Sequence, residues 1–175
     1  MGYKRLLIIA VVIMMAAPAA GEYVTAPEGL NVRKAPGLKA DILDVLPFAE
    51  EVSGEIEKGW MYLEDKNGYV CADYLSLDNP LDGMELLGTW RITAYAYTGS
   101  PCANGCYPSA GYTVACNSLD FGTEIYIDGV GFRTVEDRGP ASLGSEWCDL
   151  YLGDYWECVQ WGNQYRRVWM VKNEH

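Results

Sequence analysis

Hydrophobic and polar positions alternate over short runs in residues 22–78. The alternating runs cover residues 30–32, 42–46, 51–56, 60–63 and 69–71. Turn signals such as Lys58-Gly59 and Asn67-Gly68 separate them. Short strands at this spacing are typical of a small antiparallel barrel. We expect its core to hold Leu30, Val32, Val45, Trp60, Val70 and Leu75.

A second alternating pattern occupies residues 88–173. Strands are predicted over residues 90–97, 112–116, 124–127, 132–136, 148–152 and 167–172. One short helix is predicted over 154–161, because Asp154 is a good N-cap, Glu157 has capping-box spacing and Gly162 can end the helix. A mainly β chain with one helix before its last strand favours a second small barrel. Residues 79–87, with their Asn-Pro and Asp-Gly pairs, are predicted to be a linker.

Residues 1–20 have the pattern of a secretory signal peptide. Lys4 and Arg5 precede an apolar stretch, and Ala17-Pro-Ala-Ala20 supplies small residues for cleavage. The apolar stretch is shorter than the roughly 20 residues that span a bilayer, which disfavours the alternative of a membrane anchor. We therefore expect a secreted protein that has no membrane contact after cleavage.

The charge balance is strongly acidic, with a formal net charge of -11. Removing a signal segment that holds Lys4 and Arg5 makes it more negative. Nucleic-acid phosphates require basic stripes, so a nucleic-acid partner is excluded. The charge says little about an uncharged glycan.

The chain has six cysteines, five of them after residue 100. Export favours disulfides, with Cys102–Cys106 as a local pair and Cys116 joined to Cys148 or Cys158; spacing alone cannot decide the pairing. Neither paired C-x-x-C motifs nor Cys/His metal spacing is present, so we expect no metal or other cofactor.

The single histidine is the terminal residue His175. Cysteine and serine nucleophiles are ordinarily activated by an imidazole, and catalytic zinc is ordinarily held by histidines. An enzyme with this sequence would therefore move protons with carboxylates, tyrosine or lysine.

Two carboxylates are candidates for that chemistry. Asp137 ends a predicted strand before a Gly-Pro turn, and Asp149 lies inside a later strand among Trp147, Leu150 and Tyr151. Strand alternation places Asp149 and Tyr151 on one face. Apolar surroundings raise the pKa of an aspartic acid, so Asp149 could hold a proton as a general acid. A lone strand acid is more often a solvated surface charge.

The first module resembles a bacterial SH3 domain over its full length. The resemblance rests on Gly29-Leu-Asn-Val-Arg-Lys-Ala-Pro, Gly59-Trp-Met-Tyr-Leu and Gly68-Tyr-Val-Cys-Ala-Asp-Tyr-Leu. It implies binding to the cell wall or to wall peptides without chemistry. Exposed aromatics such as Tyr62 and Tyr74 could face such a peptide, although core packing is the commoner role of any one aromatic.

The second module resembles the "3D" domain, which is named for three aspartates. The resemblance rests on Thr93-Ala-Tyr, Thr113-Val-Ala, Phe121-Gly-Thr, Val135-Glu-Asp-Arg-Gly, Asp149-Leu-Tyr and Gln160-Trp-Gly. It covers nearly all of residues 88–172. The domain is similar to the catalytic barrels of membrane-bound lytic transglycosylase A and of stationary-phase muralytic proteins. It implies a six-stranded double-psi β-barrel.

The resemblance also assigns site residues. Asp149 matches the aspartate that acts as general acid and base, Asp137 matches the second aspartate, and Thr93 matches a threonine of the substrate groove. Asn117 stands where the family has its first aspartate and keeps a binding role in this interpretation. Tyr151, on the face of Asp149, is the other predicted substrate-binding residue.

We therefore expect a secreted, wall-associated, monomeric peptidoglycan lytic transglycosylase, whose partners are glycan strands and wall peptides. It would act on the bond between N-acetylmuramic acid and N-acetylglucosamine. The alternative is a wall-binding or wall-loosening protein that holds glycan without cleaving it, which the loss of the first aspartate favours. A disulfide-stabilised adhesin is a third interpretation, and it leaves the aspartates unexplained.

Overall fold

The computed structural model describes residues 21–172. The predicted signal peptide lies outside the described residues. Between residues 21 and 172, no helix is both long and apolar enough to cross a bilayer.

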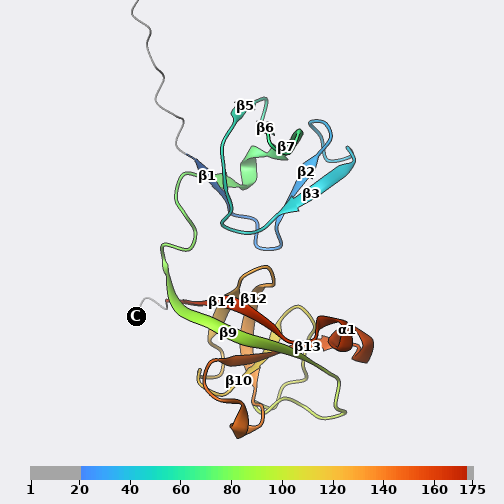
Figure 1. Cartoon of the computed structure of the whole chain (residues 1–175), viewed down its shortest axis with the longest axis vertical. Coiled ribbons are helices and arrows are strands. Elements are labelled where there is room, and N and C mark those ends of the chain that lie inside the picture. The colour runs from blue at the N-terminus through green and yellow to red at the C-terminus, as the bar shows by residue number, and fades with distance from the viewer. Residues whose placement is uncertain (1–20, 173–175) are drawn as a thin grey trace, which may run out of the picture.

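The N-terminal strands form two small sheets (Figure 1). The strands are β1 (Glu22–Val24), β2 (Leu30–Arg33), β3 (Ile42–Leu46), β4 (Glu51–Val52), β5 (Glu55–Glu57), β6 (Trp60–Leu63), β7 (Gly68–Cys71) and β8 (Leu75–Ser76), with the 3₁₀ turn Ala72–Tyr74 before the last. One sheet has the order β3-β2-β7-β6-β5 and the other β4-β1-β8. The run predicted as one strand over 51–56 is divided at residues 53–54. Gly54 lies so close to the Tyr62 carbonyl oxygen that a Cβ there would collide with it.

The core of this region is mostly the predicted one. Leu30, Val32 and Val70 are buried, and Leu75 packs against them half-buried. Trp60 is also half-buried. The prediction for Val45 is wrong: its side chain is 51% exposed and the next residue, Leu46, is buried instead. β3 is an edge strand, so only its end reaches the core.

Six later strands close into a barrel, as predicted. They are β9 (Met84–Ala96), β10 (Thr113–Cys116), β11 (Glu124–Ile127), β12 (Gly131–Asp137), β13 (Trp147–Gly153) and β14 (Gln164–Val171), with the helix α1 (Tyr155–Trp161) before β14. The order around the barrel is β10-β12-β11-β14-β9-β13. The pairs β10–β12 and β13–β9 are parallel and the others antiparallel. β9 begins at Met84, within the segment predicted as a linker.

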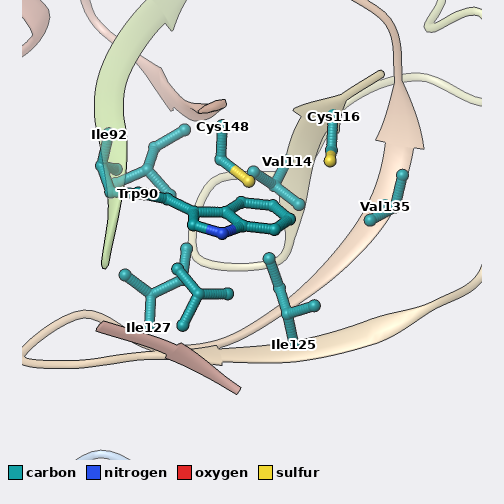
Figure 2. Close-up of a cluster of buried hydrophobic side chains, with 10 residues drawn as sticks. Trp90, Ile92, Val114, Cys116, Ile125, Ile127, Val135 and Cys148 are labelled. Carbon is teal, nitrogen blue, oxygen red and sulfur yellow. The ribbon is translucent and has the colours of Figure 1, made fainter. Parts of the chain in front are cut away.

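The barrel interior is filled by apolar side chains from every strand. Figure 2 shows the Trp90 ring at its centre, surrounded by Ile92, Val114, Ile125 and Ile127. The buried indole N–H of Trp90 has no hydrogen-bond partner among the described residues, which is a destabilising feature in a core. Successive side chains of a strand point to opposite faces. The residues of β9 and β13 that alternate with the core residues therefore lie on the outer face of the barrel.

Aromatic packing joins the two regions. Phe48, in the turn after β3, lies 5.0 Å from the Tyr126 ring and 5.3 Å from the Phe132 ring, both in the barrel. The Tyr126 hydroxyl donates to the Phe48 carbonyl oxygen at 3.4 Å. Phe48, Tyr126 and Trp169 are buried together, so the barrel is in direct contact with the N-terminal sheet.

The predicted disulfides are absent. All six cysteines, which fall within the described residues, are free thiols. Cys116 and Cys148 are nevertheless direct partners across β10 and β13, and both are buried in the barrel core. Export favours disulfides only through the surrounding redox conditions, which spacing does not reveal.

Candidate active site

Four neighbouring strands place one residue each in a single row across the outside of the barrel. Thr93 on β9 lies beside Asp149 on β13, Asp149 opposes Ala115 on β10, and Ala115 pairs with Asp137 on β12. The two aspartates thus lie two strands apart, roughly 10 Å between backbones at ordinary strand spacing. Ala115, between them, is buried, with only 3% of its surface exposed.

Asp149 is held by a chain of hydrogen bonds. The Thr93 hydroxyl donates to its Oδ1 at 2.6 Å, and the Trp147 indole N–H donates to the Thr93 oxygen at 3.0 Å. The Trp147 ring lies against Gly139, where a Cβ would collide with the ring. Gly139 therefore permits the position of Trp147, which orients the Thr93 hydroxyl toward the carboxyl group.

The surroundings of Asp149 favour its protonated form. Burial raises the pKa of the Asp149 carboxyl above its ordinary value. The hydrogen bond from Thr93 and the charge of Arg91 lower that pKa, and the charge of Asp137 raises it. Burial is the largest of these influences, so the balance is toward a carboxyl group that keeps its proton to higher pH.

Asp137 is occupied by three donors. Its Oδ1 accepts from the backbone N–H of Ala103 at 2.9 Å and from that of Arg138 at 2.8 Å. Its Oδ2 accepts from the Tyr95 hydroxyl at 3.1 Å. The bond to Ala103 fixes the loop between β9 and β10, so Asp137 acts as a tether for that loop.

Asn117 joins two loops through its amide. Its Oδ1 accepts from the Gly139 N–H at 3.0 Å, and its Nδ2 donates to the Pro140 carbonyl at 3.2 Å. An aspartate could accept but not donate, so the amide suits both contacts. Asn117 and Gly139 line a cavity of about 480 Å³, together with Ser118, Ala141, Gly144 and Ser145.

Tyr151 is on the face of Asp149, as the alternation predicts, but it is only 9% exposed. Its ring lies 5.3 Å from the Tyr95 ring, edge to face. The two tyrosines are partners across β13 and β9. Burial also raises the pKa of the Tyr95 hydroxyl, and the charge of Asp137 adds to that rise. Tyr95 therefore stays a hydrogen-bond donor to Asp137.

Sequence reasoning missed the parts played by Tyr95, Trp147 and Arg91. Alternation could have found them: Arg91 and Tyr95 flank Thr93 on one face of β9, and Trp147 is two residues before Asp149. The hydrogen bonds themselves join residues more than 40 positions apart, which no local pattern indicates.

These features define a mainly β protein with a closed six-stranded barrel that carries a half-buried carboxyl group on its outer face. The described residues contain no cluster of three or more His, Cys, Asp or Glu side chains suited to a metal ion.

Comparisons with known proteins give one distant structural likeness. No protein-family model and no curated protein matches the chain. The crystal structure of MltA from E. coli matches with a TM-score of 0.37 and 19% sequence identity. The match covers 46% of this chain and 29% of that chain, so this chain spans less than a third of the matched protein's length.

Proposed function

We propose that this protein is a peptidoglycan lytic transglycosylase in which Asp149 is the general acid and base. The single observation that carries the proposal is the half-buried Asp149 carboxyl group, which accepts a bond of 2.6 Å from Thr93 and has a raised pKa. A general acid must hold a proton near the working pH and be fixed in direction. Burial raises the pKa of Asp149 in the direction that the first property requires, and the hydrogen bond from Thr93 supplies the second property.

The proposed reaction begins with proton transfer from Asp149 to the glycosidic oxygen between N-acetylmuramic acid and N-acetylglucosamine. The bond from that oxygen to the muramic C1 breaks, and positive charge develops at C1. The muramic C6 hydroxyl attacks C1 and returns its proton to Asp149. The products are a free 4-hydroxyl on N-acetylglucosamine and a 1,6-anhydro sugar, so no water is consumed.

The state of Asp137 favours this reaction over hydrolysis. Hydrolysis of a glycosidic bond ordinarily uses two carboxylates, one of which activates water or attacks the sugar. Asp137 already accepts three hydrogen bonds and supports a loop. Asp149 is then the one carboxyl group of the row left to act, which suits a mechanism with a single acid. The cavity lined by Asn117, Ser118 and Gly139 would receive the sugars.

The second candidate function is wall binding without cleavage, with the N-terminal region as an SH3-like module. Two observations favour it: Asn117 replaces an acid in the family pattern, and both polar atoms of its amide are bonded to the backbone of a neighbouring loop. In both functions residues 22–78 would concentrate the protein on the wall.

Mass spectrometry of the soluble products from purified peptidoglycan tests the proposal. We expect anhydro-muropeptides from the wild type and at least a thousandfold less, on the order set by the loss of a general acid, from Asp149→Asn with unchanged folding. Reducing-end products would indicate hydrolysis instead. Wall binding with no soluble product would establish the second candidate.

A further inference from the structure

The Arg91 side chain lies on the outer face of the barrel, beside the candidate acid. Its neighbours on β9, Trp90 and Ile92, are both buried in the barrel core, so strand alternation directs Arg91 outward together with Thr93. Thr93 is the partner of Asp149 on β13. Two residues along one strand and one strand across separate the backbones of Arg91 and Asp149 by roughly 8 Å. Burial is the largest influence on the pKa of Asp149, and the charge of Arg91 opposes it, so the guanidinium is near enough to act on the carboxyl group.

The Arg91 guanidinium differs from the other arginines of the barrel in having no partner. In the described part of the chain, no hydrogen bond or ion pair involves it, and the bond that Arg91 makes outside the sheet runs from its backbone N–H to the Glu146 carbonyl. Every other arginine of residues 84–172 donates to a carbonyl, an amide or a carboxylate oxygen. These pairs are Arg133 with Phe132, Arg138 with Cys116, Arg166 with Gln164 and Arg167 with Asp128.

The surroundings of Arg91 leave its donors for a group from outside the chain. Arg91 is half-buried, and a charge that is withdrawn from water destabilises the fold unless it is paired. Its partners on the neighbouring strands are Tyr165 on β14 and Trp147 on β13. The Trp147 indole N–H already donates to Thr93, and an indole cannot accept a hydrogen bond. Tyr165 is 68% exposed, so this side of the site is open to a ligand.

The chemistry of Arg91 selects a carboxylate. The planar guanidinium matches a carboxylate with two parallel hydrogen bonds, which gives both energy and orientation. In the proposed reaction the bond breaks at C1 of N-acetylmuramic acid, and the same sugar has a lactyl ether on C3. The lactyl carboxyl group is an uncharged amide where a stem peptide is attached and a free carboxylate where the peptide has been removed. One sugar ring separates it from C1, which is the scale of the separation between Arg91 and Asp149.

We propose that Arg91 binds the lactyl carboxylate of peptide-free N-acetylmuramic acid and gives the site a preference for glycan strands that have lost their stem peptides. The inference rests on the proposed function for the identity of the sugar. Arg91 is then a specificity-determining residue, and Asp149 remains the acid. The preferred substrate would be supplied by a hydrolysis of the amide bond between the lactyl group and the stem peptide.

Calorimetric titration of the Asp149→Asn protein tests the ligand chemistry without cleavage. The ligands are peptide-free glycan fragments, the same fragments with their lactyl carboxylates converted to amides, and fragments that keep their stem peptides. We expect the peptide-free fragments to bind about tenfold more tightly than the other two, as a charged hydrogen bond allows.

Variants of Arg91 in the same protein assign the preference to its side chain. Arg91→Gln is expected to remove the preference, and Arg91→Lys, which keeps the charge, is expected to restore part of it. Arg167→Gln removes the same charge from an exposed residue of β14 on the same face of the barrel. It is the matched control and is expected to keep the full preference.

Three outcomes would overturn the proposal: no measurable binding of peptide-free fragments, equal affinity for free and amidated fragments, or a preference that persists in Arg91→Gln. Equally tight, Arg91-dependent binding of peptide-bearing fragments would identify a peptide carboxylate as the ligand and would also overturn it. The titration needs no turnover, so the two proposals fail separately. Anhydro products without a binding preference would contradict only this inference, and a binding preference without anhydro products from the wild type would contradict only the cleavage proposal.

Discussion

The two β regions of this protein use their polar side chains in opposite ways. On the N-terminal sheet, Glu55 and Glu57 of β5 are exposed beside the aromatic residues of β6. Glu57 has only a weak surface contact with Lys58. On the barrel face Asp149 and Asp137 are half-buried, and each accepts hydrogen bonds from fixed donors. Both faces are built by the same strand alternation.

The difference teaches what separates a binding surface from a site suited to proton transfer. An exposed carboxylate attracts a cation but is held in no fixed direction. The Asp149 carboxyl group, withdrawn from water and held by Thr93, has a raised pKa and a fixed direction, which acid–base chemistry requires. The contrast predicts that changes on the barrel face affect rate and pH dependence, and that changes on the sheet affect affinity.

After Asp149→Asn, the largest effect is expected from Thr93→Val, which keeps the side-chain shape and removes the donor to Asp149. Loss of one fixed donor is expected to lower the cleavage rate about a hundredfold. The bond lowers the pKa of Asp149, so its removal raises that pKa further. The decline of activity at high pH should therefore move to higher pH, which a pH–rate profile measures. An unmoved profile would contradict the role of Thr93.

A smaller loss is expected from Gly139→Ala, because the new methyl group must displace the Trp147 ring. We expect a loss of stability of about 1–3 kcal/mol, as for other overpacked sites, and roughly a tenfold lower rate. Thermal unfolding and product release measure the two effects. Gly83→Ala is the matched control, since no atom lies within 4 Å of its added Cβ.

The variant Asp137→Asn distinguishes a structural role of Asp137, which holds the loop between β9 and β10, from a catalytic role. An asparagine keeps an oxygen that can accept from Ala103 and Arg138, so we expect activity within about tenfold of the wild type. A loss as large as that of Asp149→Asn would show that the negative charge of Asp137 takes part in the reaction. Asp137→Ala removes the tether and should increase proteolysis between residues 97 and 112, which peptide mapping detects.

The smallest expected effect is on the pH dependence of the free energy of unfolding. Burial raises the pKa of Asp149 in the folded state above its ordinary 3.8, so the unfolded chain releases this proton first as pH rises. The free energy of unfolding therefore falls as the pH rises from the unfolded-state pKa to the folded-state pKa, and it stays lower at neutral pH. Asp149→Asn removes this loss, so its Tm should exceed that of the wild type at pH 7 by a few degrees, about 5 °C at most. The difference should vanish near pH 3.

Local pattern predicted most of the barrel. Alternation is a property of neighbouring residues, so it placed the strands of residues 112–171 within a few positions and put Asp149 with Tyr151 on one face. The helix also agrees: the Asp154 side chain accepts from the N–H groups of Trp156 and Glu157. These features depend on contacts within a few residues.

Features that depend on distant contacts were not predictable. The tether of Asp137 joins it to the backbone of Ala103, 34 residues earlier. The burial of Tyr151 depends on Tyr95, from a strand 56 positions away. Val45 has the alternation of a core residue, yet it lies on an edge strand that reaches the core only at its end. Sequence indicates which face a residue occupies but not what covers that face.

The contact of Phe48 with Tyr126 and Phe132 has a mechanical consequence. A flexible linker would let the barrel take many positions relative to the N-terminal sheet. Aromatic rings packed across the junction instead fix the N-terminal sheet relative to the carboxyl group of the barrel. In the proposed function, cuts would fall at a fixed distance from the point where the N-terminal region binds the wall. Phe48→Ala, which loosens the junction, would broaden the spread of fragment lengths.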